Sequence, residues 1–324
     1  MVDKKSLASS SNTCVALSGG VGGAKLALGL SKVLKSNQLD IIANTADDFE
    51  HIGLYICPDL DTVTYTLADL SNKELGWGQA GETWEFLNAL ERLGGESWFR
   101  LGDKDMATHV FRTQSLSSGL TLSETTAQIT QRLGIAHKII PMCDMPVATK
   151  VKVESGELMA FQHYFVRDRC EPKVTGFEFE GIKDASPSIG FSAALNNTNL
   201  GSIIICPSNP FVSVDPVLKL PGVMAAIQAA TAPTIAVSPI VGGQAIKGPA
   251  AKMMKELGMP QTALAVAEHY QGRIDGFVID EADAAMVADI EALGIKTLVT
   301  KTMMLSLQDR IDLAEACLAF AETF

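Results

Sequence analysis

The sequence predicts an α/β fold, in which a doubly wound, mainly parallel, Rossmann-like sheet carries a helical insertion and a small β excursion. Short apolar runs of strand length alternate with helix-forming segments along most of the chain. The first apolar run breaks into a glycine-rich loop that leads directly into helix formers, within residues 13–30. Two stretches in the middle of the chain depart from this alternation, one with helical and one with strand-like patterning.

The glycine-rich loop is the most informative stretch. Cys14–Leu17 is typical of a buried strand, and helix formers resume at Ala24. Glycines lack Cβ atoms, so an anion can approach the main chain, and the helix N-terminus adds a partial positive charge. We therefore expect a phosphate-binding loop rather than a tight turn without a ligand. The residues expected to bind the ligand are Ser18, Gly19, Gly20, Gly22 and Gly23.

Two familiar phosphate loops do not fit. A P-loop requires a lysine followed by Ser or Thr, whereas Lys25 precedes Leu26. The dinucleotide fingerprint requires a third glycine three positions after Gly22, where this chain has Lys25. A nicotinamide-dependent dehydrogenase is therefore the least favoured of the functions considered.

The other apolar runs supply the rest of the expected sheet. Strands are predicted at Leu39–Ala43, Ala136–Pro141, Gly201–Cys206, Thr234–Val237, Gly276–Asp280 and Lys296–Val299. Helices are predicted at Val63–Leu70, Glu82–Leu93, Ser123–Leu133, Val223–Ala230, Ala250–Leu257 and Ser306–Ala319.

The patterning divides the chain into three parts. Residues 1–12 are expected to form a disordered arm, because they are polar. Residues 13–70 plus 133–324 are expected to form the Rossmann-like core, with the small β excursion at 151–185. Residues 71–132 contain all three tryptophans and are expected to form a helical cap.

Composition narrows the functional classes. The chain has 324 residues, of which 47% are hydrophobic and 19% charged, as in a globular protein. Its net charge of −11 argues against a nucleic-acid or anionic-membrane partner. No run has the length of a transmembrane helix, and the first residues lack the apolar segment of a signal peptide. Six scattered cysteines, without a CxxC pair, predict buried free thiols in a cytoplasmic protein.

Small and polar residues follow the predicted strands, where parallel sheets bind ligands. Carboxylates gather after the second strand, on two neighbouring loops. Magnesium prefers a few carboxylate oxygens together with water and phosphate, so two of these side chains would hold it. Helix capping would also explain Asp59 and Asp61, and a turn would explain Asp47 and Asp48. The residues concerned are Asn44, Asp47 and Asp48, then Asp59 and Asp61, and after later strands Ser208, Asn209, Gly242 and Gly243.

Residues 98–109 are dense in charged and aromatic side chains. Arg100 suits a phosphate because a guanidinium can donate two parallel hydrogen bonds. The acidic residues at 103 and 105, with Lys104, would otherwise form a solvated turn. A histidine such as His109 is more often structural than catalytic, and both roles stay open for it at this point. No motif for covalent catalysis is present.

These motifs together resemble the 2-phospho-L-lactate transferase family. The segments SGGVGGAKL (18–26), NTADD (44–48), PDLDTVTYTL (58–67), RLGDKDMATH (100–109), PSNP (207–210) and SPIVGGQAIKGPAAKMM (238–254) occur in the family's order. The resemblance spans nearly the whole chain after the polar arm.

The resemblance implies a transferase of coenzyme F(420) biosynthesis. The donor would be a three-carbon acid, 2-phospholactate or phosphoenolpyruvate, activated as a GDP ester. The acceptor would be the deazaflavin Fo, whose ribityl hydroxyl attacks phosphorus while GMP leaves. The resemblance also implies magnesium and a homodimer. Phosphoryl transfer of this kind rests mainly on positioning and charge neutralisation.

The resemblance also assigns residues by motif. Asp61 and Arg100 would contact Fo, and Asp61 and Asp48 would act in catalysis. Asp47, Asp48 and Asp61 would hold the metal. The donor would lie against Ser18, Gly19, Gly20, Gly22, Gly23, Ser208, Asn209, Gly242 and Gly243.

One departure and one alternative accompany this interpretation. Archaeal members have Thr and Pro among the first glycines, whereas this chain has Val21 and Ala24, which indicates a bacterial origin and leaves the three-carbon acid open. The alternative is a non-enzymatic relative that binds a uridine nucleotide sugar and acts in regulation. The 100–109 segment and the tryptophan-bearing insertion favour the transferase.

Overall fold

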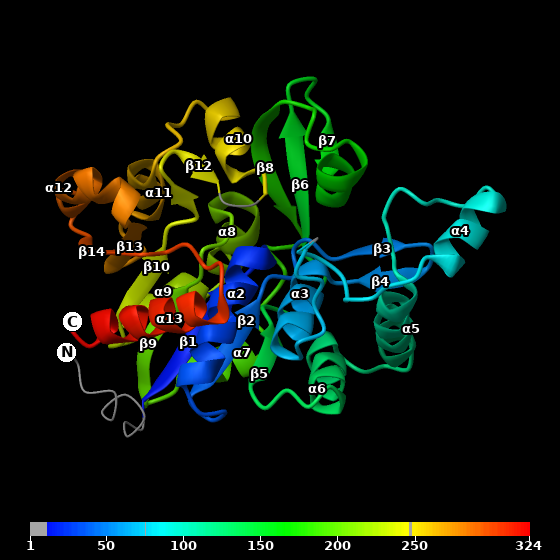
Figure 1. The fold of residues 1–324 in the computed structure, drawn as a ribbon, viewed down its shortest axis with the longest axis horizontal. Helices are drawn as coiled ribbons and strands as arrows, with labels where there is room; N and C mark the ends of the chain where they lie inside the picture. Colours follow the sequence, from blue (N-terminus) through cyan, green and yellow to red (C-terminus); the bar gives the residue numbers. More distant parts are fainter. Residues whose placement is uncertain (1–11, 75, 246–247) are drawn as a thin grey trace.

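A computed structural model describes residues 12–74, 76–245 and 248–324. Its centre is a seven-stranded sheet in which every neighbouring pair is parallel (Figure 1). The expected doubly wound α/β fold is confirmed. The strand order is β14 (Lys296–Thr300), β13 (Gly276–Asp280), β10 (Thr234–Val237), β9 (Leu200–Ile205), β1 (Thr13–Ser18), β2 (Leu39–Ala43) and β5 (Lys138–Pro141). The predicted arm lies, except for Asn12, outside the described residues.

Helices cover both faces of the sheet, because side chains alternate along each strand. On β1, Val15 and Leu17 enter one apolar cluster, and Cys14 and Ala16 enter the other. The second cluster includes α2 (Gly20–Val33), α3 (Pro58–Leu67) and α13 (Leu307–Ala321), and α13 lies alongside α2 (Figure 1). The first includes residues of α7 (Ile189–Leu195), α8 (Asp215–Leu218), α9 (Val223–Ala229), α10 (Ala250–Glu256), α11 (Ala263–Tyr270) and α12 (Val287–Glu291).

The order of the strands defines where a ligand should bind. The chain builds the sheet outward from β1 through β2 to β5, then returns to place β9 on the other side of β1. The sequence of strands therefore reverses between β1 and β9. In open α/β sheets a crevice forms at this point, outside the carboxyl ends of the strands.

Three smaller units are attached to the core. The predicted cap contains α4 (Glu85–Arg92), α5 (Asp103–Ser117) and α6 (Leu122–Arg132). An antiparallel hairpin of β3 (Phe49–His51) and β4 (Leu54–Ile56), which the sequence analysis did not predict, reaches toward α4 and α5 (Figure 1). The β excursion is an antiparallel sheet of β6 (Ala148–Val153), β7 (Leu158–Ala160) and β8 (Val174–Glu180). Short elements complete the chain: η1 (His163–Arg167), η2 (Pro210–Val214), β11 (Ile240–Val241), β12 (Gln244–Ala245) and η3 (Glu281–Met286).

The solvated turn considered for residues 103–105 is wrong, because α5 begins there. The Asp103 carboxylate accepts the backbone N–H groups of Glu85 and Phe86, at 3.1 Å each, and so caps α4. Glu82 in turn accepts the first N–H groups of α5, from Lys104 at 2.8 Å and from residue 105 at 2.9 Å. Two acidic side chains thus satisfy the helix starts reciprocally.

No single helix in the described part of the chain is long and apolar enough to cross a membrane. One pair bent by 76°, Pro210–Leu218 with Val223–Ala229, passes the same test together by length and composition alone.

Candidate functional site

The glycine-rich loop and the loop after β9 meet where the strand order reverses. The Gly19 N–H donates to Ser208 Oγ at 3.1 Å, and the Ser208 hydroxyl donates to the Gly19 carbonyl at 2.8 Å. Asn209 follows directly, and its side-chain oxygen accepts the Phe211 N–H at 3.0 Å. The two loops that the sequence analysis assigned to one ligand are therefore joined to each other at the expected crevice.

The glycines have a structural reason besides access for an anion. Helix α2 begins at Gly20, so the later glycines lie within its first turn. A Cβ on Gly22 would lie 2.2 Å from the Pro207 carbonyl oxygen, and one on Gly23 would lie 2.8 Å from Ser208 Oγ. Glycine therefore lets α2 pack against the loop after β9.

The N-terminus of α2 is partly occupied by the protein itself. The Gly20 N–H donates to Asp59 Oδ1 at 2.7 Å. The other oxygen of Asp59 accepts from Asn44 Nδ2 at 3.0 Å, so both oxygens of this buried carboxylate are bonded. The next N–H groups of the first turn, on Val21 and Gly22, have no acceptor within an α-helix. These two groups are the part of the helix N-terminus that suits an anion.

Buried carboxylates concentrate at the end of β2. Asp47 Oδ1 and both side-chain oxygens of Asp48 are buried and have no hydrogen-bond partner at normal hydrogen-bond geometry within the described residues. Burial raises the pKa of Asp47 well above its ordinary value, and the neighbouring Asp59 and Asp48 carboxylates raise it further. Burial also raises the pKa of Asp48 well above its ordinary value, and the Cys57 thiol and the Arg112 guanidinium offset only part of this rise. A cation bound beside these carboxylates would lower their pKa and favour the ionised form.

Asp61 has a different environment. Arg112 of α5 binds both of its oxygens, with Nη1 donating to Oδ2 at 3.1 Å and Nη2 donating to Oδ1. His109 Nδ1 lies 3.2 Å from Arg112 Nη1, and His109 Nε2 lies 3.3 Å from Asp105 Oδ2. The Tyr65 hydroxyl donates to Asp105 Oδ1 at 2.5 Å. This chain of contacts, the α3–α5 network, joins the core helix to the cap.

Two sets of residues have donor atoms for a divalent cation. Ligand atoms of Asp61, Asp105 and His109 lie within 4.8 Å of one another. The Arg112 guanidinium, however, takes both oxygens of Asp61 and places a positive charge where the ion would lie. The oxygens of Asp47 and Asp48 have no such competitor among the described residues. Magnesium therefore fits the end of β2 better than the α3–α5 network.

The remaining predicted residues lie around these features. Arg100 is exposed, and its guanidinium stacks over the Trp84 ring at 4.4 Å. Gly242 and Gly243 form the turn between β11 and β12, after the end of β10. The Gly242 N–H donates to the buried Asp283 carboxylate at 3.1–3.2 Å, which fixes this turn.

The sequence analysis did not select Arg112. It lies beyond the last residue of the 100–109 segment, and nothing in its neighbours marks it. A signal existed nevertheless: residues 105, 109 and 112 have helical spacing, which places one carboxylate, one imidazole and one guanidinium on the same face. The charged residues 103–105 conceal this signal, because they are also typical of a solvated turn.

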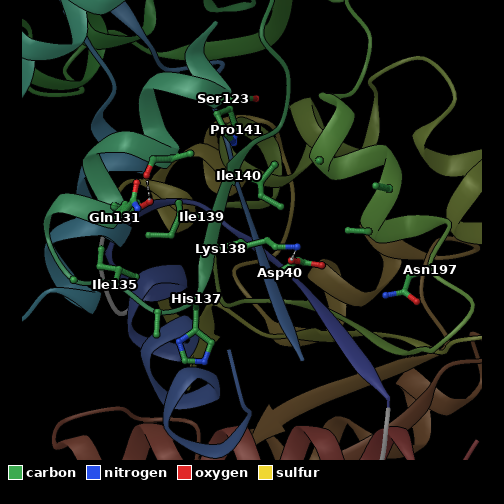
Figure 2. A pocket seen from close by; sticks show the side chains of 17 residues that line it. Asp40, Ser123, Gln131, Ile135, His137, Lys138, Ile139, Ile140, Pro141 and Asn197 are labelled. Carbon is green, nitrogen blue, oxygen red and sulfur yellow. Dashed lines mark hydrogen bonds and ion pairs between the residues drawn. The ribbon is translucent and has the colours of Figure 1, made fainter. Parts of the chain in front are cut away.

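A groove of about 870 Å³ lies elsewhere, along the outer edge of β5 (Figure 2). Its lining includes Asp40, His137 and Lys138, which lie at the amino ends of β2 and β5, and the side chains of Ile139 and Ile140. Lys138 pairs with Asp40 across its floor at 3.6 Å. Ligands of parallel sheets bind at the opposite ends of the strands, so the groove is separate from the crevice.

Comparison with known proteins completes the description. The family model described as 2-phospho-L-lactate transferase CofD matches residues 14–303. The chain is 39% identical over 313 residues to the phosphoenolpyruvate transferase of Streptomyces griseus, covering 95% of this chain and 98% of that protein. It is 35% identical over 309 residues to the 2-phospho-L-lactate transferase of Methanosarcina barkeri, with coverage of 95% and 98%. A UPF0052-family protein from Bacillus halodurans has the same fold, with a TM-score of 0.61, 16% identity and coverage of 95% and 98%.

Proposed function

Because the chain belongs to the 2-phospho-L-lactate transferase CofD family, we propose that it transfers a phospholactyl or phosphoenolpyruvyl group to the deazaflavin Fo. The donor is the GDP-activated ester of the three-carbon acid. The ribityl hydroxyl of Fo attacks the phosphorus that carries the acid, a phosphodiester forms, and GMP leaves. The product is the precursor of coenzyme F(420), in its saturated or dehydro form.

The observation that supports this proposal best is the place between β1 and β9 where the strand order reverses. It combines a helix N-terminus with two available N–H groups, two loops held together by Ser208, and unpartnered buried carboxylates. Phosphoryl transfer needs positioned phosphates and neutralised charge rather than a covalent intermediate. We place the GDP part of the donor against Ser18–Gly23, Ser208 and Asn209, with Gly242 and Gly243 at its border.

Magnesium is part of the proposal. We assign it to Asp47 and Asp48, because one buried oxygen of Asp47 and both of Asp48 have no hydrogen-bond partner at normal geometry within the described residues. A divalent cation there would neutralise phosphate oxygens during transfer. Asp61, expected as a third ligand, has both oxygens bonded to Arg112, and we assign it to the acceptor hydroxyl instead. Arg100 remains the proposed second contact of Fo.

Two further properties are proposed without bearing on the chemistry. We propose a homodimer, which sedimentation of the purified protein would test. We also propose a cytoplasmic location, supported by six free cysteines, of which five are buried.

The experiment that tests the function combines acceptor binding and product mass. Fo is titrated by fluorescence with GDP and magnesium present, and the GDP esters of phospholactate, phosphoenolpyruvate and 3-phosphoglycerate are then compared as donors. We expect saturable Fo binding and a phosphodiester product with GMP. Lys138→Met in the remote groove is the control and should react like the wild type. Absence of Fo binding, with stabilisation by a uridine nucleotide sugar, would contradict the proposal.

A further inference from the structure

The α3–α5 network is more elaborate than a helix contact requires. Arg112 is almost fully buried, as are the side chains of Asp61 and His109. Burying a charge costs free energy unless the charge is paired with good geometry. An apolar contact would join the two helices without this desolvation cost. Asp61 is the side chain that Arg112 binds most fully, because the guanidinium donates to both of its oxygens.

We propose that Arg112 is a positioning residue of the transfer reaction, which holds the Asp61 carboxylate in one orientation for the acceptor hydroxyl. The inference rests on the proposed function, in which Asp61 contacts the acceptor. Arg112 itself does not touch substrate. It acts through Asp61, and His109 and Asp105 act through Arg112.

The contacts explain why the positioning residue is an arginine. A planar guanidinium donates two parallel hydrogen bonds to a carboxylate and so fixes the plane of that carboxylate. A lysine in the same place would keep the charge but would bind as a single point. The remaining donor capacity of Arg112 Nη1 reaches the Tyr55 carbonyl oxygen at 3.3 Å, which ties the guanidinium to β4 as well.

The other members of the network hold Arg112 in place. His109 Nδ1 lies 3.2 Å from Arg112 Nη1 on the same face of α5. On the other side of the imidazole, His109 Nε2 lies 3.3 Å from Asp105 Oδ2, and the Tyr65 hydroxyl of α3 donates to Asp105. The orientation of Asp61 is therefore set by the cap helix, and not only by its own helix α3. This arrangement couples the acceptor side of the site to the position of the cap.

The test is a double-mutant cycle in the full-length protein. Arg112→Lys, Asp61→Asn and the combined variant are compared with the wild type for kcat, for the KM of each substrate and for thermal stability. Arg132→Lys is the matched control, because Arg132 lies in the same cap and stacks on Phe111 at 4.4 Å rather than binding a carboxylate. Wild-type transfer is measured first by product mass.

We expect Arg112→Lys to lower kcat about tenfold to a hundredfold, the cost of a misplaced reacting group, with the donor KM nearly unchanged. The combined variant should be no slower than Asp61→Asn alone, since Arg112 works through Asp61. A purely structural role would lower stability and the fraction of active protein without this coupling. If Arg112→Lys does not fold, His109→Gln should show a smaller loss of kcat that also disappears beside Asp61→Asn.

Three results would overturn the inference. If Arg112→Lys folds and has the same kcat as Arg132→Lys, the two parallel hydrogen bonds from Arg112 to Asp61 are not needed for transfer. Losses that multiply in the combined variant would show that Arg112 acts independently of Asp61. A wild type that binds Fo but transfers nothing would remove the proposed function and this inference with it, whereas an active wild type with either of the first two results removes the inference alone.

Discussion

Replacement of Gly22 by alanine tests whether the packing of α2 against the loop after β9 holds the donor site together. The new Cβ would lie 2.2 Å from the Pro207 carbonyl oxygen, 1.2 Å short of the 3.4 Å at which ordinary contact begins. Either the helix or the loop must move by about this amount. Because Pro207 precedes Ser208, the displacement would reach both hydrogen bonds between Ser208 and Gly19.

The magnitude follows from opposing effects. Overpacking a tight contact costs about 1–3 kcal/mol, and alanine in a helix regains up to about 1 kcal/mol relative to glycine. We expect a net loss of about 1–2 kcal/mol in the free energy of unfolding. The two Ser208 hydrogen bonds are each worth about 1 kcal/mol, so their joint loss would lower GDP affinity about thirtyfold.

Helix α2 also provides the control. A Cβ on Gly29 would lie 2.0 Å from the Arg310 carbonyl oxygen of α13, a clash of the same kind far from the crevice. Gly29→Ala should lose at least as much stability and keep its affinity for GDP. Calorimetry would measure unfolding and GDP binding with magnesium for both variants. Equal GDP affinities in the two variants would refute the reasoning, because the Gly22 contact would then have no effect on the site.

Four further predictions concern charge. Asp48→Asn should raise the magnesium concentration needed for half-maximal transfer at least about tenfold, since one carboxylate ligand is lost. Because burial raises the pKa of Asp48 and the metal binds the ionised form, wild-type magnesium affinity should rise with pH; titration at several pH values would measure this, and a flat profile would contradict it. Burial raises the pKa of Asp215, but hydrogen bonds and charges from His269 and Lys219 outweigh burial, so the net pKa is lowered. The ionised carboxylate therefore stabilises the fold above about pH 3.9, and this stabilisation is lost as the pH falls through the lowered pKa. Asp215→Asn should therefore cost about 2 kcal/mol in unfolding experiments at neutral pH, with the difference from wild type disappearing in acid; an equal difference at pH 3 would argue against it. Burial raises the pKa of the Cys14 thiol to about 12, so a thiol reagent at pH 8 should not modify it before unfolding, which mass spectrometry of labelled peptides would check.

Much of the architecture could be predicted from the sequence because parallel strands are buried on both faces. Their apolar runs are continuous, so Leu39–Ala43 and Thr234–Val237 were located to the residue. The β3–β4 hairpin escaped prediction because its strands have only three residues each. Helix α5 was missed because its first turn contains two aspartates, and because its N-terminus is capped by Glu82 from outside the helix while Asp103 caps α4.

Part of the candidate site could also be predicted, namely the residues at the ends of the strands. Strand ends identified Ser208 and the carboxylates after β2, since parallel strands bring their carboxyl ends to one edge. Sequence could not separate Asp61 from Asp47 and Asp48, because all three belong to similar acidic motifs. Their difference lies in Arg112, more than fifty positions beyond Asp61, whose guanidinium binds Asp61 but, among the described residues, neither of the other two carboxylates.

The close approach of Gly22 to Pro207 has a consequence for how such chains evolve and are recognised. Selection on this position acts through the fold, since any side chain there would press against the neighbouring loop whatever the ligand is. A descendant that lost its substrate would still retain the glycine. Glycine patterns of this kind therefore trace the ancestry of an architecture, whereas the unpartnered acids beside them record its chemistry.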